Sequence, residues 1–280
     1  PAGTSLLRDI NAGTYGSYPS AFTALADGRV LFAADDGSSG EELWITDGTE
    51  AGTVLLRDIN PGPRSSSPWN LTPLGDGRVV FSADDGSNGE ELWITDGTAA
   101  GTVLLRDIWP RNRSSDPISF TPLGDGRVLF AADDGISGEE LWITDGTEAG
   151  TILLRDISPG GDDSDLDDFT PLGDGRVLFV ADDGSNGEEL WITDGTAAGT
   201  VLVRDIHPWD GSSPSQLTPL GNGRVLFVAD DGSSGEELWI TDGTEAGTIL
   251  LRDIRPGSGS SYPGSLTPLG GGRVLFMADD

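Results

Sequence analysis

Large aromatic side chains recur in one variable segment of the sequence, which occurs six times, at residues 11–21, 60–70, 109–119, 158–168, 207–216 and 255–265. Solvated loops seldom carry bulky rings unless the rings pack or bind something. Flat indole and phenol faces offer stacking surfaces to a ligand. We therefore predict that these variable loops bind a ligand through the rings found in five of the six copies: Tyr15, Tyr18, Trp69, Trp109, Trp209 and Tyr262. Two alternatives are that the rings cover the ends of the fold, and that the loops vary because little constrains them.

An acidic turn of the pattern Asp-Asp-Gly-x-x-Gly-Glu-Glu also recurs, and hard cations such as calcium prefer oxygen ligands of this kind. The spacing differs from that of an EF-hand, and adjacent aspartates often cap turns or pair with arginine. We therefore predict no cofactor, and keep calcium binding at several equivalent turns as an alternative. Two of the copies are Asp84, Asp85, Glu90 and Glu91, and Asp133, Asp134, Glu139 and Glu140.

Catalytic chemistry has little support in the sequence. The chain has no cysteine and one histidine, His207, which is expected to be a solvated loop residue rather than a general base. Glycoside hydrolysis needs one particular pair of carboxylates across a cleft, and a repeated array supplies no singular pair. No Ser-His-Asp arrangement has a distinctive spacing. We predict that the protein is not an enzyme.

Charge and hydropathy exclude further classes of partner. The 47 acidic residues face 16 arginines and no lysine, which gives a formal net charge of -31 and repels a phosphate backbone, so no nucleic-acid partner is expected. The longest apolar stretches are about five residues, far too short for a membrane span, so no membrane insertion is expected. Hydrophobic residues make up 36% of the chain, which indicates a packed protein despite its 42 glycines.

The elements that hold these residues follow from an internal repeat. The tripeptide Arg-Asp-Ile occurs six times at intervals of 49 or 48 residues, with its aspartate at Asp9, Asp58, Asp107, Asp156, Asp205 and Asp253. Within residues 71–108, four short apolar segments are separated by Gly and Asp turn signals, and Gly75-Asp76-Gly77 is a strong hairpin signal. The pattern predicts strands at 71–74, 78–83, 91–95 and 102–108, joined as an antiparallel meander.

Consecutive apolar residues in the second and third predicted strands require cover on both faces of each small sheet. Meanders that stack on one another every 40 to 50 residues are typical of a β-propeller. We predict an all-β fold, a six-bladed propeller that forms a single domain over residues 1–280 from repeats of about 49 residues. A linear solenoid is the alternative, but it would need polar end caps. In such meanders the acidic turns and the variable loops emerge on the same face.

The last repeat is incomplete. Residues 1–4 match Glu50–Thr53 and the chain ends at Asp280, so the closing blade would take two strands from the C-terminal end and one from residues 4–10, with one strand missing. An unpaired strand edge invites another strand. We expect either a longer parent array or self-association in which another chain supplies the missing strand.

One motif carries a resemblance to a known family. Glu-Leu-Trp-Ile-Thr-Asp-Gly-Thr-x-Ala-Gly-Thr, as at Glu42–Thr53 and Glu91–Thr102, resembles the signature of the ELWxxDGT repeat family, and the likeness extends over almost the whole chain. The resemblance implies a secreted or surface repeat protein of bacteria. It implies no catalytic residue.

These observations together predict a non-enzymatic module, located extracellularly or on a bacterial cell surface, that recognises a glycan or protein through the variable loops. Repetition would multiply weak contacts, as in lectin-like propellers. The alternatives are a structural or adhesive repeat protein without a small-ligand site, and a calcium-binding scaffold.

Overall fold

The computed structural model describes residues 3–280, which form strands, turns and loops with no helix. No helix in this range is therefore long and apolar enough to cross a membrane. The chain divides into two compact units, residues 1–135 with 143–152, and residues 136–142 with 153–280.

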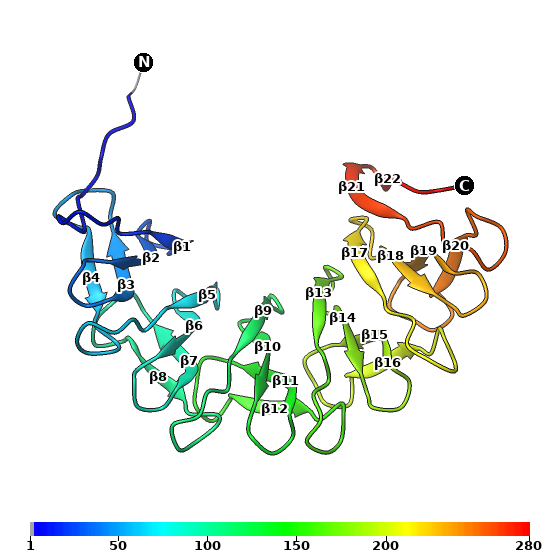
Figure 1. Cartoon of the computed structure of the whole chain (residues 1–280), viewed down its shortest axis with the longest axis horizontal. Coiled ribbons are helices and arrows are strands. Elements are labelled where there is room, and N and C mark those ends of the chain that lie inside the picture. The colour runs from blue at the N-terminus through cyan, green and yellow to red at the C-terminus, as the bar shows by residue number, and fades with distance from the viewer. Residues whose placement is uncertain (1–2) are drawn as a thin grey trace. The chain divides into compact units, whose positions relative to one another are not determined.

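The strands form six antiparallel sheets, in which strands adjacent in sequence are neighbours (Figure 1). The first three sheets contain β1 (Ser20–Ala24), β2 (Val30–Asp35), β3 (Glu41–Thr46) and β4 (Val54–Arg57); β5 (Trp69–Pro73), β6 (Val79–Asp84), β7 (Glu90–Thr95) and β8 (Val103–Arg106); and β9 (Ile118–Pro122), β10 (Val128–Asp133), β11 (Glu139–Thr144) and β12 (Ile152–Arg155). The last three contain β13 (Asp167–Pro171), β14 (Val177–Asp182), β15 (Glu188–Thr193) and β16 (Val201–Arg204); β17 (Ser215–Pro219), β18 (Val225–Asp230), β19 (Glu236–Thr241) and β20 (Ile249–Arg252); and β21 (Gly264–Gly270) and β22 (Arg273–Met277).

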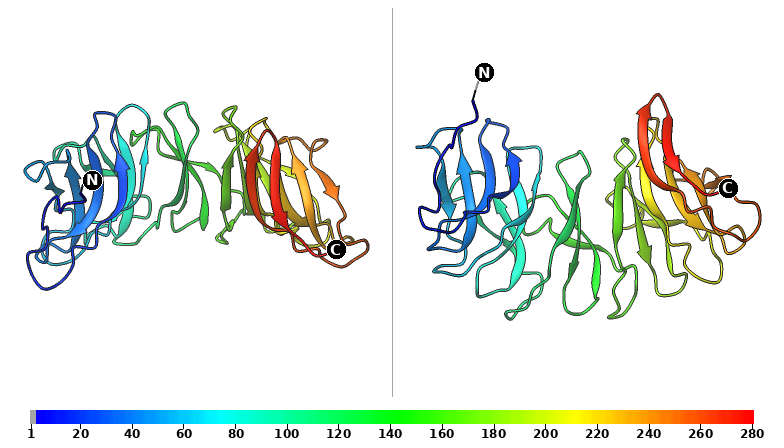
Figure 2. Two further views of the ribbon diagram at one scale, coloured as in Figure 1. Left: turned by 90° about the horizontal axis from the view of Figure 1, so that it is seen from above. Right: turned by 45° about the horizontal axis from the view of Figure 1, so that its top comes forward.

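These sheets confirm the fold class: the chain is an all-β propeller-type protein with six consecutive blades, five of them four-stranded meanders. Figure 2 shows from two further directions that the strands of each sheet run side by side. The central pair of strands is fully in register, as in the second blade, where Val79 pairs with Thr95 and Asp84 pairs with Glu90. Each central strand is buried on both of its faces, which accounts for its consecutive apolar residues.

Neighbouring blades bury these faces against each other. In the first unit, Leu31, Leu43 and Ile45 of the first blade belong to one buried cluster with Phe81 and Trp93 of the second. In the second unit, the fourth and fifth blades repeat this arrangement, with Leu190 and Ile192 in one cluster with Phe227 and Trp239. The prediction that the blades cover one another is therefore confirmed within each unit.

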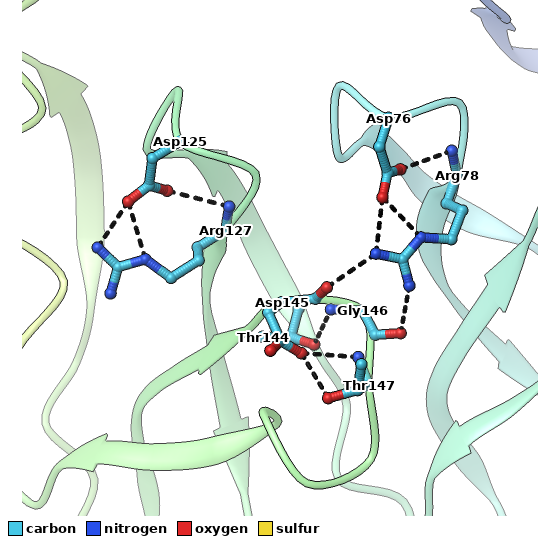
Figure 3. A network of polar contacts seen from close by, with 8 residues as sticks. All are labelled: Asp76, Arg78, Asp125, Arg127, Thr144, Asp145, Gly146 and Thr147. Carbon is cyan, nitrogen blue, oxygen red and sulfur yellow. Dashed lines mark hydrogen bonds and ion pairs between the residues drawn. The ribbon is translucent and has the colours of Figure 1, made fainter.

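Arginine side chains add polar contacts between consecutive blades. Arg78, beside the first turn of the second blade, donates from Nη1 to the carbonyl oxygen of Gly146 (2.7 Å) and from Nη2 to that of Asp145 (3.0 Å) in the third blade, while Asp76 forms an ion pair with it (2.7 Å; Figure 3). Arg106 donates to the carbonyl oxygen of Thr151 at the other end of the same turn (2.7 Å). A guanidinium fork can bridge several oxygens in a fixed geometry, whereas a lysine ammonium is a single point. This gives a physical reason for arginine at these positions.

The sixth blade differs from the prediction. It has two strands rather than three, and residues 4–10, expected to supply the third, form no strand. In the complete blades the fourth strand pairs with the third, and the sixth blade has no third strand to act as the template.

Residues 4–10 nevertheless contact the first blade. Their contacts are those that an arginine at the end of the fourth strand of a complete blade makes with the next blade in sequence. The Arg8 guanidinium donates to the carbonyl oxygen of Thr53 (2.5 Å) and lies 5.9 Å from the centre of the Trp44 ring. Arg204, between two complete blades, makes the corresponding contacts with Thr248 and Trp239. The expectation of a longer array or of a strand from another chain stays a prediction.

Because the indole of Trp93 is 95% buried between two blades, we predict that Trp93→Ala lowers the free energy of unfolding by about 3 to 5 kcal/mol. Trp209 is the matched control, since it is 88% exposed and its replacement by alanine should change stability by less than about 0.5 kcal/mol. Urea denaturation of both variants measures the difference. Equal losses for the two variants would contradict the interblade position of Trp93.

Candidate functional site

The acidic turns form the base on which the variable loops lie. In the second blade, the turn contains Gly86 and Gly89, both with positive φ (76° and 85°). A Cβ on Gly86 would lie 2.6 Å from Oδ1 of Asn60, in the loop that enters the blade, and a Cβ on Gly89 would lie 2.5 Å from the carbonyl oxygen of Arg113, in the loop that leaves it. Each turn thus supports two consecutive loops, and only glycine fits at both places. The predicted shared face of turns and loops is confirmed.

A buried glutamate of the acidic turn anchors each variable loop. Glu91 is fully buried and accepts hydrogen bonds from the backbone nitrogen of Ile108 (2.7 Å) and from the hydroxyl (2.6 Å) and backbone nitrogen (3.2 Å) of Ser115. One carboxylate therefore holds the start of the loop at residues 109–119 and Ser115 within it. The equivalent buried residues in the other complete blades are Glu42, Glu140, Glu189 and Glu237.

Burial has a strong effect on the acidity of these glutamates. It raises the pKa of Glu42, Glu91 and Glu140 from 4.5 to about 7, because removal from water penalises the charged form more than the hydrogen bonds favour it. Burial also raises the pKa of Glu189. Glu42, Glu91 and Glu140 consequently titrate near neutral pH.

The two aspartates of the turn shape it through hydrogen bonds with its backbone. Oδ1 of Asp84 accepts from the backbone nitrogen of Gly86 (2.6 Å), and Oδ1 of Asp85 accepts from those of Ser87 and Asn88 (2.8 Å each). Together with Glu91 on its loop, these carboxylates point at separate protein donors. Within residues 3–280 no group of three or more acidic or histidine side chains is arranged to hold a metal ion. The geometry gives the calcium alternative no support.

The predicted aromatic residues divide into exposed rings and one packed ring. Trp109 is half-buried: its indole lies against Gly135 of the next acidic turn, and the Arg113 guanidinium is 5.7 Å from its centre. It therefore fits the alternative that a ring covers the end of a blade. The other five rings are 56% to 88% exposed: Tyr15, Tyr18, Trp69, Trp209 and Tyr262. No ring stacking joins any two of the six within the described chain, so they form separate contact points.

Trp69 lines a hollow in the first unit. A groove of about 340 Å³ lies along β1 and β5, and it is lined by Ala21, Phe22, Thr23, Trp69, Asn70, Leu71 and Thr72. None of these residues is charged, although the chain carries a net charge of -31. Phe22 was not predicted as a site residue because it stands at the start of a predicted strand, where a ring looks like ordinary sheet packing. Asn70 was not predicted because the prediction for its loop rested on aromatic rings alone.

A backbone irregularity sets the direction of Trp69. β5 pairs with β6 through a bulge between Trp69 and Thr72, and Asn70 in the bulge has a φ of 56°. A left-handed non-glycine residue costs roughly 1 kcal/mol or more and persists only where its surroundings hold it. The same bulge occurs at the start of all six blades, with left-handed residues Ala21, Asn70, Ser119, Asp168, Gln216 and Ser265. The first strand of every blade thus begins with the same backbone geometry.

His207 is not the solvated residue that the sequence suggested. Its imidazole is half-buried against Gly232, and its backbone nitrogen donates to Oε1 of the anchor Glu189 (3.1 Å). Nδ1 is buried and has no hydrogen-bond partner in the described part of the chain. The side chain fills the position that Trp109 fills in the third blade, so it is a packing residue of its loop.

The sequence matches no protein-family model and no curated protein. Solved structures with the same fold include a puromycin hydrolase, with a TM-score of 0.51 and 19% identity over 94% of this chain and 42% of that chain. A structure from a study of two prolyl endopeptidases has a TM-score of 0.51 and 15% identity over 93% of this chain and 37% of that chain. The chain thus spans about two fifths of these proteins, which it matches in their propeller domains, and the likeness shows the fold alone.

Because Glu91 receives donors from the start and from the interior of one loop, Glu91→Ala should leave buried N–H groups without acceptors and expose the amides of Ile108 and Ser115 to exchange. Hydrogen exchange should increase at residues 108–119 more than in the strands. Glu148→Ala is the control, since Glu148 is exposed and alanine stands at the equivalent positions 99 and 197. Unchanged protection of residues 108–119 in Glu91→Ala would contradict the anchoring role.

The raised pKa of the anchors predicts a stability that falls with rising pH. Between pH 4.5 and about 7 the folded state holds the Glu91 proton more tightly than the unfolded chain, so this contribution is complete below 4.5 and is lost as the pH rises through 7. Asp47 and Asp96 act in the opposite sense, because hydrogen bonds lower their pKa below 3.8 and their contribution is lost in stronger acid.

We therefore expect the urea midpoint to be higher at about pH 5 than at about pH 8. Repulsion among the other acids also lowers the urea midpoint as the pH rises, so Glu91→Gln is the informative comparison. This variant changes the total charge by only one unit, and the difference between its urea midpoints at about pH 5 and about pH 8 should be clearly smaller than that of the parent. The same difference between the two midpoints in Glu91→Gln and in the parent would contradict the raised pKa of Glu91.

Proposed function

We propose that this chain is a non-enzymatic extracellular binding module that recognises a glycan or protein through several variable loops at once. The single observation that supports this most is Trp69, an exposed indole beside an uncharged groove on a backbone that is held in place. Its loop is anchored by Glu42, which accepts from the backbone nitrogen of Ile59 (2.7 Å) and the hydroxyl of Ser66 (2.6 Å). A preorganised ring loses little conformational entropy on binding.

The chemistry of the groove favours an uncharged ligand, and a neutral sugar ring is the better candidate of the two classes. A pyranose can stack its C–H face on the Trp69 indole. The side-chain amide of Asn70 makes no hydrogen bond within residues 3–280, so both its donor and its acceptor can serve ligand hydroxyls.

Repetition supplies avidity. Five exposed rings on four loops would each make a weak contact, and a polymeric ligand that engages several of them binds through a high effective concentration. A repeating glycan chain has this character. The motif resemblance to the ELWxxDGT repeat family supports placing the module outside a bacterial cell or on its surface.

No catalytic activity is part of this proposal. The puromycin hydrolase and the prolyl endopeptidase structure share the fold, but this chain spans about two fifths of their length at 15% to 19% identity. Glu42, Glu91 and Glu140, whose pKa burial raises to about 7, are loop anchors that hold backbone donors.

A glycan array with the purified chain tests the proposal. Trp69→Ala should weaken binding of the recognised glycan at least about tenfold, the effect of losing a stacked ring at the centre of a contact. Val54→Ala is the control, because Val54 is an exposed apolar residue of β4 outside the loop face. An array without signal at high protein concentration, or equal affinity for Trp69→Ala and the parent, would count against glycan recognition and favour a structural or adhesive repeat.

A further inference from the structure

Three Asn-Gly pairs occur in the chain: Asn88-Gly89, Asn186-Gly187 and Asn222-Gly223. In this dipeptide the backbone nitrogen of the glycine can approach the preceding side-chain amide with little hindrance, because glycine has no Cβ. The attack releases ammonia and forms a cyclic imide. Whether it occurs in a folded protein depends on how firmly the asparagine and the glycine are held.

Two of the three pairs are locked into acidic turns. The side-chain nitrogen of Asn88 donates to Oδ2 of Asp85 (2.8 Å), and that of Asn186 donates to Oδ2 of Asp183 (2.8 Å). Their glycines lie directly beneath a variable loop, where even a Cβ would be 2.5 Å from another backbone atom. A charge-assisted hydrogen bond and the covering loop both hold the reacting groups in place.

The third pair, Asn222-Gly223, has neither the hydrogen bond to the asparagine nor the loop that covers the glycine. Asn222 is exposed in the turn between β17 and β18, and its side chain makes no hydrogen bond within residues 3–280. Gly223 has no heavy atom within 4 Å of the place where a Cβ would lie. Glycine also precedes Asn222, so residues with positive φ (74° and 75°) flank it on both sides.

Asn222 also occupies a position where the four preceding blades have aspartate. Each of those aspartates forms an ion pair with the arginine two residues later, at 2.7 or 2.8 Å: Asp27 with Arg29, Asp76 with Arg78, Asp125 with Arg127, and Asp174 with Arg176. Arg224 stands at the equivalent place in the fifth blade and has no ion pair among the described residues. A carboxylate at residue 222 could therefore form the same ion pair with the guanidinium of Arg224.

We propose that Asn222 is a deamidation site, and that its aspartyl product forms the ion pair with Arg224 that the other turns already contain. The Gly223 nitrogen bonds to Cγ of Asn222, the Cγ–Nδ2 bond breaks, and the proton of the Gly223 nitrogen leaves with Nδ2 as ammonia. Water then opens the imide at either carbonyl and gives an aspartyl or an isoaspartyl residue. The step needs only water, and base accelerates it.

Trypsin digestion makes the test specific, because each Asn-Gly pair falls in a different arginine-terminated peptide that contains no other asparagine: residues 79–106, 177–204 and 205–224. The native protein is incubated at mildly alkaline pH, and mass spectrometry follows the replacement of one NH by one oxygen in each peptide. Residue 222 should react at least about tenfold faster than residues 88 and 186, the factor corresponding to a lost charge-assisted hydrogen bond.

The same incubation in denaturant is the control, and there all three peptides should react at comparable rates. Native rates that are equal at the three sites, or slowest at residue 222, would overturn the proposed site. For the ion pair, NMR titration should give the residue 222 carboxyl of Asn222→Asp a lower pKa than in Asn222→Asp with Arg224→Gln. Equal values would overturn that part of the proposal.

Discussion

A four-stranded blade of this protein has two apolar faces and therefore cannot be stable alone. The central strands of the second blade are buried on both sides, and Trp93 lies in one buried cluster with Leu31, Leu43 and Ile45 of the first blade. Burial of apolar area is the dominant favourable contribution to folding, so stacking of consecutive blades is the constraint on which the other features depend. The arginine forks, such as Arg78 on the Thr-Asp-Gly-Thr turn, then fix how one blade meets the next.

The same stacking explains why the loops can vary. The parts of the repeat that recur in each complete blade make many of the contacts that orient a loop. The buried glutamate accepts hydrogen bonds from backbone donors of the loop, and the two glycines of the acidic turn lie against the backbone of one loop and the first side chain of another. Backbone groups do not depend on the identity of the side chain. Exposed residues such as Trp209 and Tyr262 can therefore differ between blades while the course of the chain stays the same.

The sequence predicts the strands and the common face of turns and loops because both follow from local signals, namely short apolar runs and Asp-Gly turns. It does not reveal that Glu91 is buried whereas Glu90 is only partly so, although alternation along a strand places adjacent residues on opposite faces. The strand predicted at residues 4–10 was wrong, because strand propensity without a neighbouring strand gives no ladder. The partial burial of Trp109 is likewise visible only in the structure, where its indole lies against Gly135.

Two consecutive loops share each acidic turn, and this couples loop positions that are far apart in sequence. The second turn touches Asn60 through Gly86 and the backbone of Arg113 through Gly89, so any shift of that turn moves the start of one loop and the middle of the next. Since Glu91 belongs to the same turn and carries a proton in part of its population near pH 7, its ionisation acts on a loop junction rather than on one isolated loop. A ligand that engages several loops would therefore bind a surface whose elements are already held in a common geometry, which reduces the entropy lost at each successive contact.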